Sequence, residues 1–371
     1  MTAHSFSRNL ERLVEMERPL IRFFTDSAAA RMDHDDPETC DLLAGNPQEM
    51  ALPQFVESLR RWSAPQDPHW FAYKFNEPYA QEAAAAGLRE RRNLAFEPED
   101  VFLTDGAFAG LNLCLRVVSD PGDEVIFCSP PWFFYRALIV AGGAVPVRVR
   151  VDPETWDLDV DAIAAAVTAR TRAIIVNSPH NPTGKIYAPE TLERLSAVLS
   201  AASERHGRPI YLISDEAYSR ILFDDRPFPS PTEFYPFSFL VYTYGKQLLT
   251  PGERVGYVAL PPSMPEREAL RGPMMFSQIA FGAHGVPGAV LQRAVGDLDS
   301  LTVDVKTLQR RRDRMVDALR SFGYELHSPE GTFYLLPTSP DPDDVAFTER
   351  LGADKVYVLP GSLVETPGRF R

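Results

Sequence analysis

Cysteine, positive charge and long apolar runs are all scarce in this sequence. Its 371 residues include three cysteines, Cys40, Cys114 and Cys128, with no C-x-x-C spacing. An odd number of widely spaced cysteines argues against a disulfide framework and against a thiolate metal site, and it fits a reducing compartment. Lysine and arginine number 38 against 51 aspartates and glutamates, a formal net charge of −13. A surface with this excess of acid repels nucleic-acid backbones and anionic lipid.

Apolar runs long enough to span a bilayer, roughly 20 residues, are also missing. Residues 1–24 (MTAHSFSRNLERLVEMERPLIRFF) mix Glu11, Glu15 and Glu17 with arginines. They therefore have neither the apolar core of a secretion signal nor the acid-free composition of a transit peptide. The overall balance, 44% hydrophobic and 24% charged, is typical of a globular protein with a substantial core. We expect a cytoplasmic protein that binds neither membrane nor nucleic acid.

Short β-rich runs alternate with helical stretches through the middle of the chain. Apolar runs bounded by turn residues predict strands at 101–103, 124–128, 145–151, 173–176, 210–214, 239–243 and 255–260. Periodicity and punctuation predict helices over 107–117, 133–141, 160–166 and 189–204. This alternation indicates an α/β fold with a mostly parallel central sheet and helices on both faces. Ligands in such folds bind beyond the carboxyl ends of the strands.

The last part of the chain has a different pattern. After Pro287 a long, mostly helical stretch is predicted. The segments YELHSPEGTFYLLP (324–337) and KVYVLPG (355–361) then predict strands of a second, smaller sheet.

Three polar segments stand at the ends of predicted strands. NSPHNPTGK contains the Pro and Gly of a rigid turn that would aim the amide of Asn181. In SDEAY, Asp215 comes where a carboxylate can lie half-buried against a ligand cation. In TYGKQLLTPGERVGY, Lys246 follows an apolar strand. Taken singly, an ordinary loop, a capping carboxylate and a solvent-facing lysine explain these residues as well or better.

Together and in this order, the three segments supply the parts of a pyridoxal 5′-phosphate site: an amine to form an imine, a carboxylate for the pyridinium nitrogen, and polar groups for the phenolic oxygen and phosphate. On these motifs the sequence resembles the class I/II aminotransferases of the aspartate-aminotransferase fold type, from AGNP near Gly45 to the terminal GRFR. The resemblance implies the type I fold of pyridoxal-phosphate-dependent transferases. It also implies a large cofactor-binding domain at 51–285 and a smaller α+β domain built from 1–50 and 286–371.

The resemblance implies a catalytic role for Lys246, Asp215 and Tyr218. Lys246 resembles the Schiff-base lysine of the family, whose amine must lose its proton to attack the aldehyde and, once freed, can move a proton to or from the substrate. Asp215 resembles the partner of the ring nitrogen, so its replacement by asparagine should harm the chemistry more than cofactor binding. Asn181 and Tyr218 match the pair that hydrogen-bonds the phenolic oxygen.

Further residues match the family's contacts with the ring and the phosphate. Trp132, in SPPWFFY, resembles the aromatic residue that stacks on the ring, although a place in the core would also suit a tryptophan. Backbone groups of Ala107 and Phe108, in TDGAFAGL, are expected to hold the phosphate at a helix N-terminus. Thr243 and Arg254 match the hydroxyl and guanidinium ligands of the phosphate.

Substrate binding and a shared site follow from the same resemblance. Gly45 and Arg371 match positions that bind the α-carboxylate, for which an arginine offers bidentate pairing. Asn181 is expected to contact the substrate as well. Tyr73, in WFAYKF, resembles a tyrosine that a neighbouring subunit lends to the phosphate site, and this predicts a homodimer with two sites at one interface. Packing in a core or an interface would explain Tyr73 about as well.

The sequence also departs from the family pattern. Gly245 stands where many relatives have serine, so one phosphate hydroxyl is expected to be missing. Phe108 stands in a turn where some aspartate-using relatives have a lysine, and FSQIAFGAHG (276–285) offers no arginine. Burial of a second carboxylate without a partner is costly, so a neutral or aromatic amino donor is favoured over aspartate. Relatives continue beyond Arg371; either the sequence is truncated or this arginine is poorly braced.

Three interpretations of the site remain. The first is a transaminase that moves an amino group between an L-amino acid and a 2-oxo acid. The second is a lyase, decarboxylase or cyclising synthase, which the same fold accommodates. The third is a pyridoxal-binding regulatory domain, but the chain has no basic helix-turn-helix extension before Gly45 and carries a charge of −13. The transaminase is our leading hypothesis.

Overall fold

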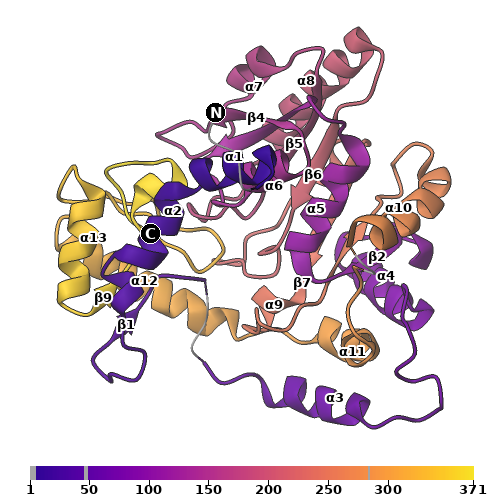
Figure 1. The fold of residues 1–371 in the computed structure, drawn as a ribbon, viewed down its shortest axis with the longest axis horizontal. Coiled ribbons are helices and arrows are strands. Elements are labelled where there is room, and N and C mark those ends of the chain that lie inside the picture. Colours follow the sequence, from indigo (N-terminus) through magenta and orange to yellow (C-terminus); the bar gives the residue numbers. More distant parts are fainter. Residues whose placement is uncertain (1–5, 46–48, 283–284) are drawn as a thin grey trace.

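The computed structural model describes residues 6–45, 49–282 and 285–371. A seven-stranded sheet lies at the centre, and a two-stranded sheet lies apart from it (Figure 1). The strands are β1 (Cys40–Asp41), β2 (Val101–Thr104), β3 (Glu124–Ser129), β4 (Val145–Arg150), β5 (Thr171–Asn177), β6 (Tyr211–Asp215), β7 (Ser238–Thr243), β8 (Gly256–Ala259) and β9 (Val356–Tyr357). The helices are α1 (Arg8–Met16), α2 (Arg18–Asp26), α3 (Pro53–Ser63), α4 (Pro78–Arg92), α5 (Gly106–Val118), α6 (Tyr135–Ala141), α7 (Val160–Ala166), α8 (Pro189–His206), α9 (Tyr244–Gln247), α10 (Arg267–Gly282), α11 (Ala289–Ser300), α12 (Val305–Ser321) and α13 (Asp344–Ala353). Short 3₁₀ turns are η1 (Ala29–Arg31), η2 (Pro98–Asp100), η3 (Pro231–Glu233) and η4 (Gly361–Val364).

The central sheet has the strand order β2-β8-β7-β6-β5-β3-β4. Every neighbouring pair is parallel except those made by β8, which runs antiparallel to both β2 and β7. The prediction of a mostly parallel sheet is therefore confirmed. The carboxyl ends of β2, β3, β5, β6 and β7 share one edge with the start of β8, so loops from six strands meet there.

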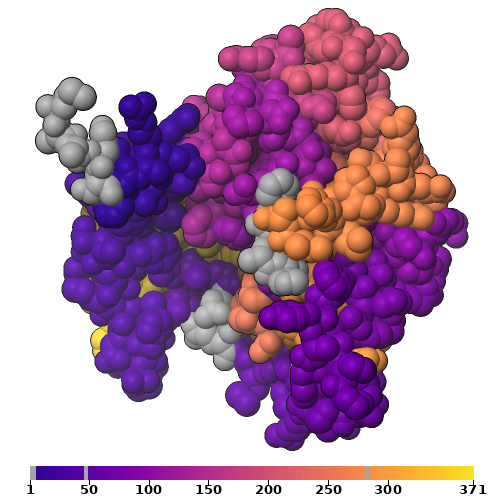
Figure 2. Space-filling view, turned by 45° about the vertical axis from the view of Figure 1, so that its right-hand side comes forward, coloured from indigo at the N-terminus to yellow at the C-terminus, as the bar shows by residue number. Residues whose placement is uncertain are grey.

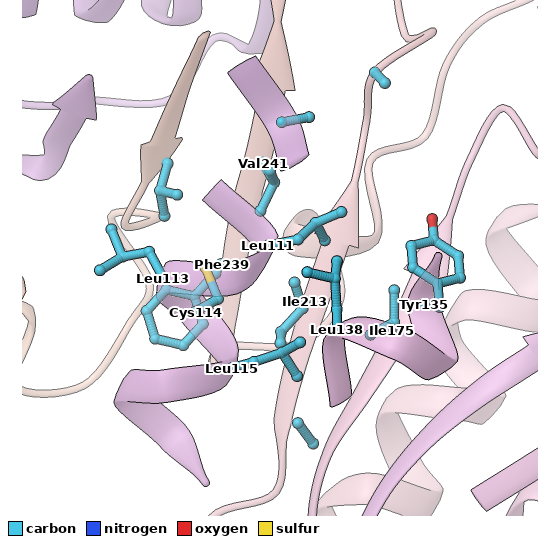
Figure 3. Close-up of a cluster of buried hydrophobic side chains, with 14 of the residues drawn as sticks. Leu111, Leu113, Cys114, Leu115, Tyr135, Leu138, Ile175, Ile213, Phe239 and Val241 are labelled. Atoms are coloured by element: carbon cyan, nitrogen blue, oxygen red, sulfur yellow. The ribbon is translucent and has the colours of Figure 1, made fainter. Parts of the chain in front are cut away.

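Helices cover both faces of this sheet because its strands are apolar on both sides. In β3, Val125 and Phe127 pack into a core with α5 and α6, whereas Ile126 and Cys128 pack into a second core with α7 and α8. Alternate side chains point to opposite faces of a strand, so one apolar run supplies two cores. Figure 3 shows the first core, between α5, α6 and the strands. A third core joins β2, β7 and β8 to α3, α4 and α11.

Helix boundaries follow local signals in the sequence. Proline opens α8, and Gly207, with φ at +65°, ends it in the left-handed conformation that glycine adopts without strain. The predicted helix at 133–141 begins two residues later, at Tyr135, because the aromatic residues before it form a turn. The single helical stretch predicted after Pro287 is divided into α11 and α12.

The smaller sheet contains less strand than predicted. Residues 355–361 contribute β9, which pairs in parallel with β1, but the strand predicted at 324–337 is wrong. This segment forms an isolated bridge between Gly331 and Leu222 instead. Its backbone bonds go to loops: the amide of Gly331 donates to the carbonyl of Gly184 at 3.1 Å. Pro329 and Pro337 also lack the N–H that a strand ladder needs.

The N-terminal helices α1 and α2 lie with the C-terminal elements on one side of the molecule, and α4, α10 and α11 lie on the other (Figure 1). Helix α11 packs on α3 and α4 of residues 51–285, while α12 leads to the C-terminal elements. The domain boundaries stay a prediction. In the described ranges no helix is both long and apolar enough to cross a membrane. The expected cytoplasmic location is likewise still a prediction.

Candidate active site

The structure brings eleven of the twelve predicted site residues to one cavity of about 280 Å³ at the shared sheet edge. They come from loops that are far apart in sequence, and their chemical roles stay predictions. The residues in the cavity wall are Gly45, Ala107, Phe108, Trp132, Asn181, Asp215, Tyr218, Thr243, Lys246, Arg254 and Arg371.

Tyr73 is the predicted residue that does not line this cavity. Its side chain is 87% exposed at the surface of the chain. A single chain thus leaves Tyr73 outside its own site, and the expected contribution to a neighbouring subunit stays a prediction.

Lys246 lies in the four-residue helix α9, directly after β7. The side chain of Thr243 caps this helix by accepting from the amide of Gly245 at 3.4 Å. The Lys246 Nζ donates to the carbonyl of Gly45 at 3.0 Å, and it lies 5.9 Å from the ring centroid of Tyr218. The amine therefore stands inside the cavity, next to a backbone carbonyl and an aromatic ring.

Gly245, which stands where many relatives were expected to have serine, has little room for a side chain. A Cβ at this position would lie 3.1 Å from the Cα of Pro251 and 3.3 Å from the carbonyl of Thr250. The loop after α9 folds back closely over the helix, so a side chain would have to displace backbone.

Asp215 is buried at the end of β6, where its carboxylate has two hydrogen-bond donors. The hydroxyl of Tyr135 donates to Oδ2 at 2.5 Å, and the amide of Ala217 donates to Oδ1 at 3.2 Å. Burial raises the pKa of Asp215 to about 6, although the bond from Tyr135 acts in the opposite direction. A buried carboxylate beside a cavity is a suitable partner for a cationic ring nitrogen.

Tyr135 contacts the site through Asp215 and was not among the residues predicted from the sequence. It lies at the edge of the first core with its hydroxyl directed away from the apolar side chains (Figure 3). Burial strongly raises the pKa of its phenol, so it stays a donor. Its place in SPPWFFY, three residues after Trp132, was the available signal, but a tyrosine at the start of a helix looks like ordinary core.

An anion cradle opens at the N-terminus of α5. Gly106 begins this helix with φ at +76°, and a Cβ there would lie 2.7 Å from Nη2 of Arg254 and 3.4 Å from Oγ1 of Thr243. The 13-residue helix directs its first N–H groups to the same place. Arg254 bonds the carbonyls of Pro251 and Asp105, which fixes its guanidinium at the cavity mouth. The donor set matches a phosphate.

Trp132 and neighbouring aromatic rings form one wall of the cavity. The ring of Trp132 meets Phe108 edge to face, with centroids 5.2 Å apart, and Phe134 in the same way at 5.3 Å. Such packing fixes the plane of the indole and leaves it along the cavity. Phe133 and Phe24, the latter from α2, also line the wall and were not predicted from the sequence.

Arg371 is buried and faces into the cavity. Its guanidinium donates to Oδ1 of Asn181 at 3.1 Å and to the carbonyl of Leu43 at 3.2 Å, and its Nε has no partner. It also lies 4.4 Å from the ring centroid of Tyr334. Across the described chain, no aspartate or glutamate side chain pairs with this arginine. A buried guanidinium with donor capacity to spare suits a substrate carboxylate.

Tyr334 lines the cavity beside Arg371 and was not among the predicted site residues. Its hydroxyl lies 2.9 Å from that of Tyr218, and a Cβ on Gly45 would come within 1.8 Å of it. Gly45 is therefore required for this close approach. Burial strongly raises the pKa of Tyr218, which keeps its phenol protonated and able to donate.

A lysine, a buried aspartate, an aromatic wall and an anion cradle at one edge of a parallel sheet define the class: a pyridoxal-phosphate-dependent enzyme of fold type I. The chain belongs to the family described as aminotransferase class I and II, whose profile matches residues 38–371. It is 31% identical over 378 residues to the aspartate/prephenate aminotransferase of Thermus thermophilus. The match covers 98% of this chain and 94% of that protein.

Two further relatives extend the comparison. The aspartate aminotransferase of Thermotoga maritima is 31% identical over 359 residues, or 93% of this chain and 89% of that protein. A crystal structure of an aminotransferase from Eubacterium rectale superposes with a TM-score of 0.85 at 27% identity, covering 100% of this chain and 93% of that one. The chain is an aminotransferase, and its family implies pyridoxal 5′-phosphate as cofactor.

Proposed function

We propose that this aminotransferase moves an amino group between an L-amino acid with a neutral or aromatic side chain and a 2-oxo acid. One observation carries this preference. In the described part of the cavity wall the positively charged side chains are Lys246, Arg254 and Arg371. In this proposal Lys246 and Arg254 bind the cofactor, and Arg371 binds the α-carboxylate. A dicarboxylate substrate would bury its second carboxylate without a partner.

The rest of the wall supports the same preference. Phe24, Leu43, Phe133 and Leu359 line the cavity near Arg371, whose guanidinium lies 5.9 Å from the ring centroid of Phe133. Apolar and aromatic surfaces of this kind bind apolar side chains by removing them from water. Because several relatives are named for aspartate, aspartate is the donor against which the preference is tested below.

The residues would divide the work as follows. Pyridoxal 5′-phosphate, when bound, supplies an electrophilic aldehyde and an electron-accepting ring. Lys246 would hold the aldehyde carbon, and its Nζ, once released, would take and return the proton of the substrate α-carbon. Arg371, with Asn181, would orient the substrate through its α-carboxylate. Asp215 would keep the ring nitrogen protonated.

The remaining residues would fix the cofactor in place. Thr243, Arg254 and the amides of Ala107 and Phe108 would hold the phosphate. Tyr218 would donate to the phenolic oxygen, and Trp132 would restrict the ring to one plane. These groups keep the reacting atoms aligned and exclude water from them.

Amino donors with apolar or aromatic side chains should react faster than aspartate. We expect kcat/KM for phenylalanine or leucine to exceed that for aspartate by about 10- to 100-fold, because one unpaired charged group costs roughly 1.5–3 kcal/mol. The measurement is the loss of the visible absorption of the loaded enzyme on mixing with single amino acids, with no oxo acid present. Equal or faster reaction with aspartate would contradict the preference. Persistent colour with released product would indicate a lyase or synthase.

Phe24 provides a matched control for this preference. Phe24 and Ile21 lie on the same helix with similar exposure, 46% and 43%, but Ile21 does not line the cavity. Phe24→Ala should lower kcat/KM for phenylalanine more than for alanine, and Ile21→Ala should lower neither.

We further propose a homodimer with shared sites. Tyr73 lies near other exposed apolar side chains, including Phe71, at 59% exposure, and Phe276 of α10, at 68%. The two segments are adjacent, since Asn76 donates to Gln278 at 2.7 Å, and Figure 2 shows the orange surface of α10 beside the purple surface of earlier residues. A second copy would cover this surface and receive Tyr73 at its phosphate cradle.

Mixing two inactive variants tests the shared site. Lys246→Ala and Tyr73→Ala should each have little activity alone. After unfolding and refolding together, about half of the dimers are hybrids, each with one intact site of two, so about one quarter of wild-type activity should return. Activity no greater than the sum of the two variants would show that Tyr73 serves no partner site.

A further inference from the structure

Helix α9 carries Lys246 but is too short to hold its own position. It has four residues, and isolated helices of this length do not form in water. The residues on either side of Lys246 in this helix are buried, with Gln247 at 1% exposure. The orientation of Lys246 therefore depends on the tertiary contacts that the other residues of α9 make.

The side-chain amide of Gln247 joins three segments of the chain. Its Oε1 accepts from Nη1 of Arg220 at 3.1 Å, and its Nε2 donates to the carbonyls of Leu298 at 3.2 Å and Leu301 at 2.6 Å. The backbone carbonyl of Gln247 accepts from the amide of Val303 at 2.9 Å. These bonds attach α9 to the joint between α11 and α12.

Arg220 extends the same network to the other side of the site. It lies two residues beyond Tyr218 in the loop that follows Asp215, and its Nη1 also donates to the carbonyl of Asp299 at 2.7 Å. One buried amide thus links the lysine helix, the loop of the cofactor-binding carboxylate and the joint that leads to the C-terminal elements.

A second contact holds the first residue of α9 against the same helix end. The hydroxyl of Tyr244 donates to Oδ1 of Asp299 at 3.0 Å, and Arg91 pairs with both oxygens of this carboxylate, at 2.6 and 3.1 Å. Buried ion pairs of this kind define geometry more than they add stability. Helix α9 is therefore bonded to the end of α11 at both of its own ends.

We propose that Gln247 is a positioning residue that sets where the amine of Lys246 stands in the cavity. This inference rests on the proposed role of Lys246. Loss of the amide bonds would leave the C-terminal end of α9 with only the backbone bond from Val303 to this joint. The end of the helix would shift, and the amine would leave its contact with the carbonyl of Gly45. Misplacement of a reacting group by about 1 Å can lower a rate by 10²-fold.

The first test uses the cofactor-free protein. Gln247→Leu removes all three side-chain bonds, and Gln292→Leu is the matched control. Gln292 is equally buried, accepts one bond from the amide of Glu77, and donates two, to the carbonyls of Phe75 and Pro287. Competitive labelling with acetic anhydride, read by peptide mass, measures the reactivity of the Lys246 amine. We expect it to change several-fold in Gln247→Leu and not in Gln292→Leu.

The second test uses the loaded enzyme with its best amino donor. Gln247→Leu should lower kcat by about 10- to 100-fold while KM stays within about twofold, since Arg371 is untouched. Gln247→Glu keeps the bond from Arg220, so its kcat should lie between those of wild type and Gln247→Leu. The same variant replaces Gln247→Leu in both tests if Gln247→Leu does not fold. Equal labelling of both glutamine variants, or a change in KM alone, would overturn the proposal. A wild-type enzyme without amino-transfer activity would instead contradict the proposed function, and the labelling comparison would still stand.

Discussion

Lys246→Ala should abolish amino transfer. The variant loses both the amine that would hold the cofactor aldehyde and the base that would move the α-proton, so we expect kcat/KM to fall on the order of 10⁴-fold or more. The arrangement in the cavity supports this expectation, because Lys246 is the lysine that the described wall contains and its Nζ stands 3.0 Å from the carbonyl of Gly45. The measurement is the rate of oxo-acid formation from phenylalanine.

Lys185→Ala is the control for this prediction. Lys185 belongs to the same NSPHNPTGK segment as Asn181, but it pairs with Glu330 at 3.4 Å and does not line the cavity. Borohydride treatment followed by intact mass should leave the cofactor attached to wild type and to Lys185→Ala, and not to Lys246→Ala. If Lys246→Ala keeps a tenth of the activity or retains the attached mass, another amine performs these tasks.

Much of the site could be predicted because its residues follow strands that the sequence marks strongly. Asn181, Asp215 and Lys246 each come a few residues after an apolar run, and parallel strands bring such positions to one edge. Order along the chain was not sufficient by itself, because an ordinary loop, a capping carboxylate and a solvent-facing lysine explain the three segments singly as well or better. The resemblance to the aminotransferase family assigned the roles of these residues and of Ala107 and Phe108.

The residues that were missed act through contacts that no local pattern records. Tyr135 and Tyr334 are aromatic residues in apolar surroundings, and only their hydroxyl contacts with Asp215 and Tyr218 distinguish them from core. Phe24 belongs to an N-terminal helix whose packing depends on the last residues of the chain. Sequence periodicity carries no information on which distant surfaces meet.

The break between α11 and α12 was missed for a related reason. The residues 301–304 could continue a helical pattern, but Leu301 and Val303 give their backbone groups to Gln247. These tertiary hydrogen bonds stand at the end of α11, whereas α12 begins at a local cap, since Asp304 accepts from the amide of Thr307 at 3.0 Å. The strand predicted at 324–337 failed in the same way, since its backbone groups are bonded by loops of the central domain.

Asp215→Asn should lower the rate of amino transfer more than it weakens cofactor binding. An asparagine keeps the size of the side chain and an acceptor for Tyr135, but it lacks the charge that would hold the ring nitrogen protonated. We expect kcat/KM to fall by about 10²- to 10³-fold, similar to the loss of one preorganised electrostatic contact. The phosphate cradle and Lys246 are unchanged, so the visible absorption of the bound cofactor should persist. A fall of less than about tenfold would contradict this role.

The stability of the cofactor-free protein provides an independent test of the same residue. The pKa of Asp215 is about 6 in the folded chain and 3.8 ordinarily, because burial penalises the charged form. A folded chain that binds this proton more tightly is destabilised once the carboxylate ionises, so the penalty is absent below pH 3.8 and complete above pH 6. Asp215→Asn should therefore exceed wild type in free energy of unfolding above pH 6, by about 3 kcal/mol at most, and lose this advantage as the pH falls to 4.

Cofactor loading should narrow this difference between the two proteins. A protonated ring nitrogen next to Asp215 would offset part of the cost of the buried negative charge, so loading should stabilise wild type more than Asp215→Asn above pH 6. Urea unfolding of both proteins, with and without cofactor, gives the four values that are needed. If loading stabilises both proteins equally, the carboxylate does not face the ring nitrogen, and the raised pKa of Asp215 reflects burial alone.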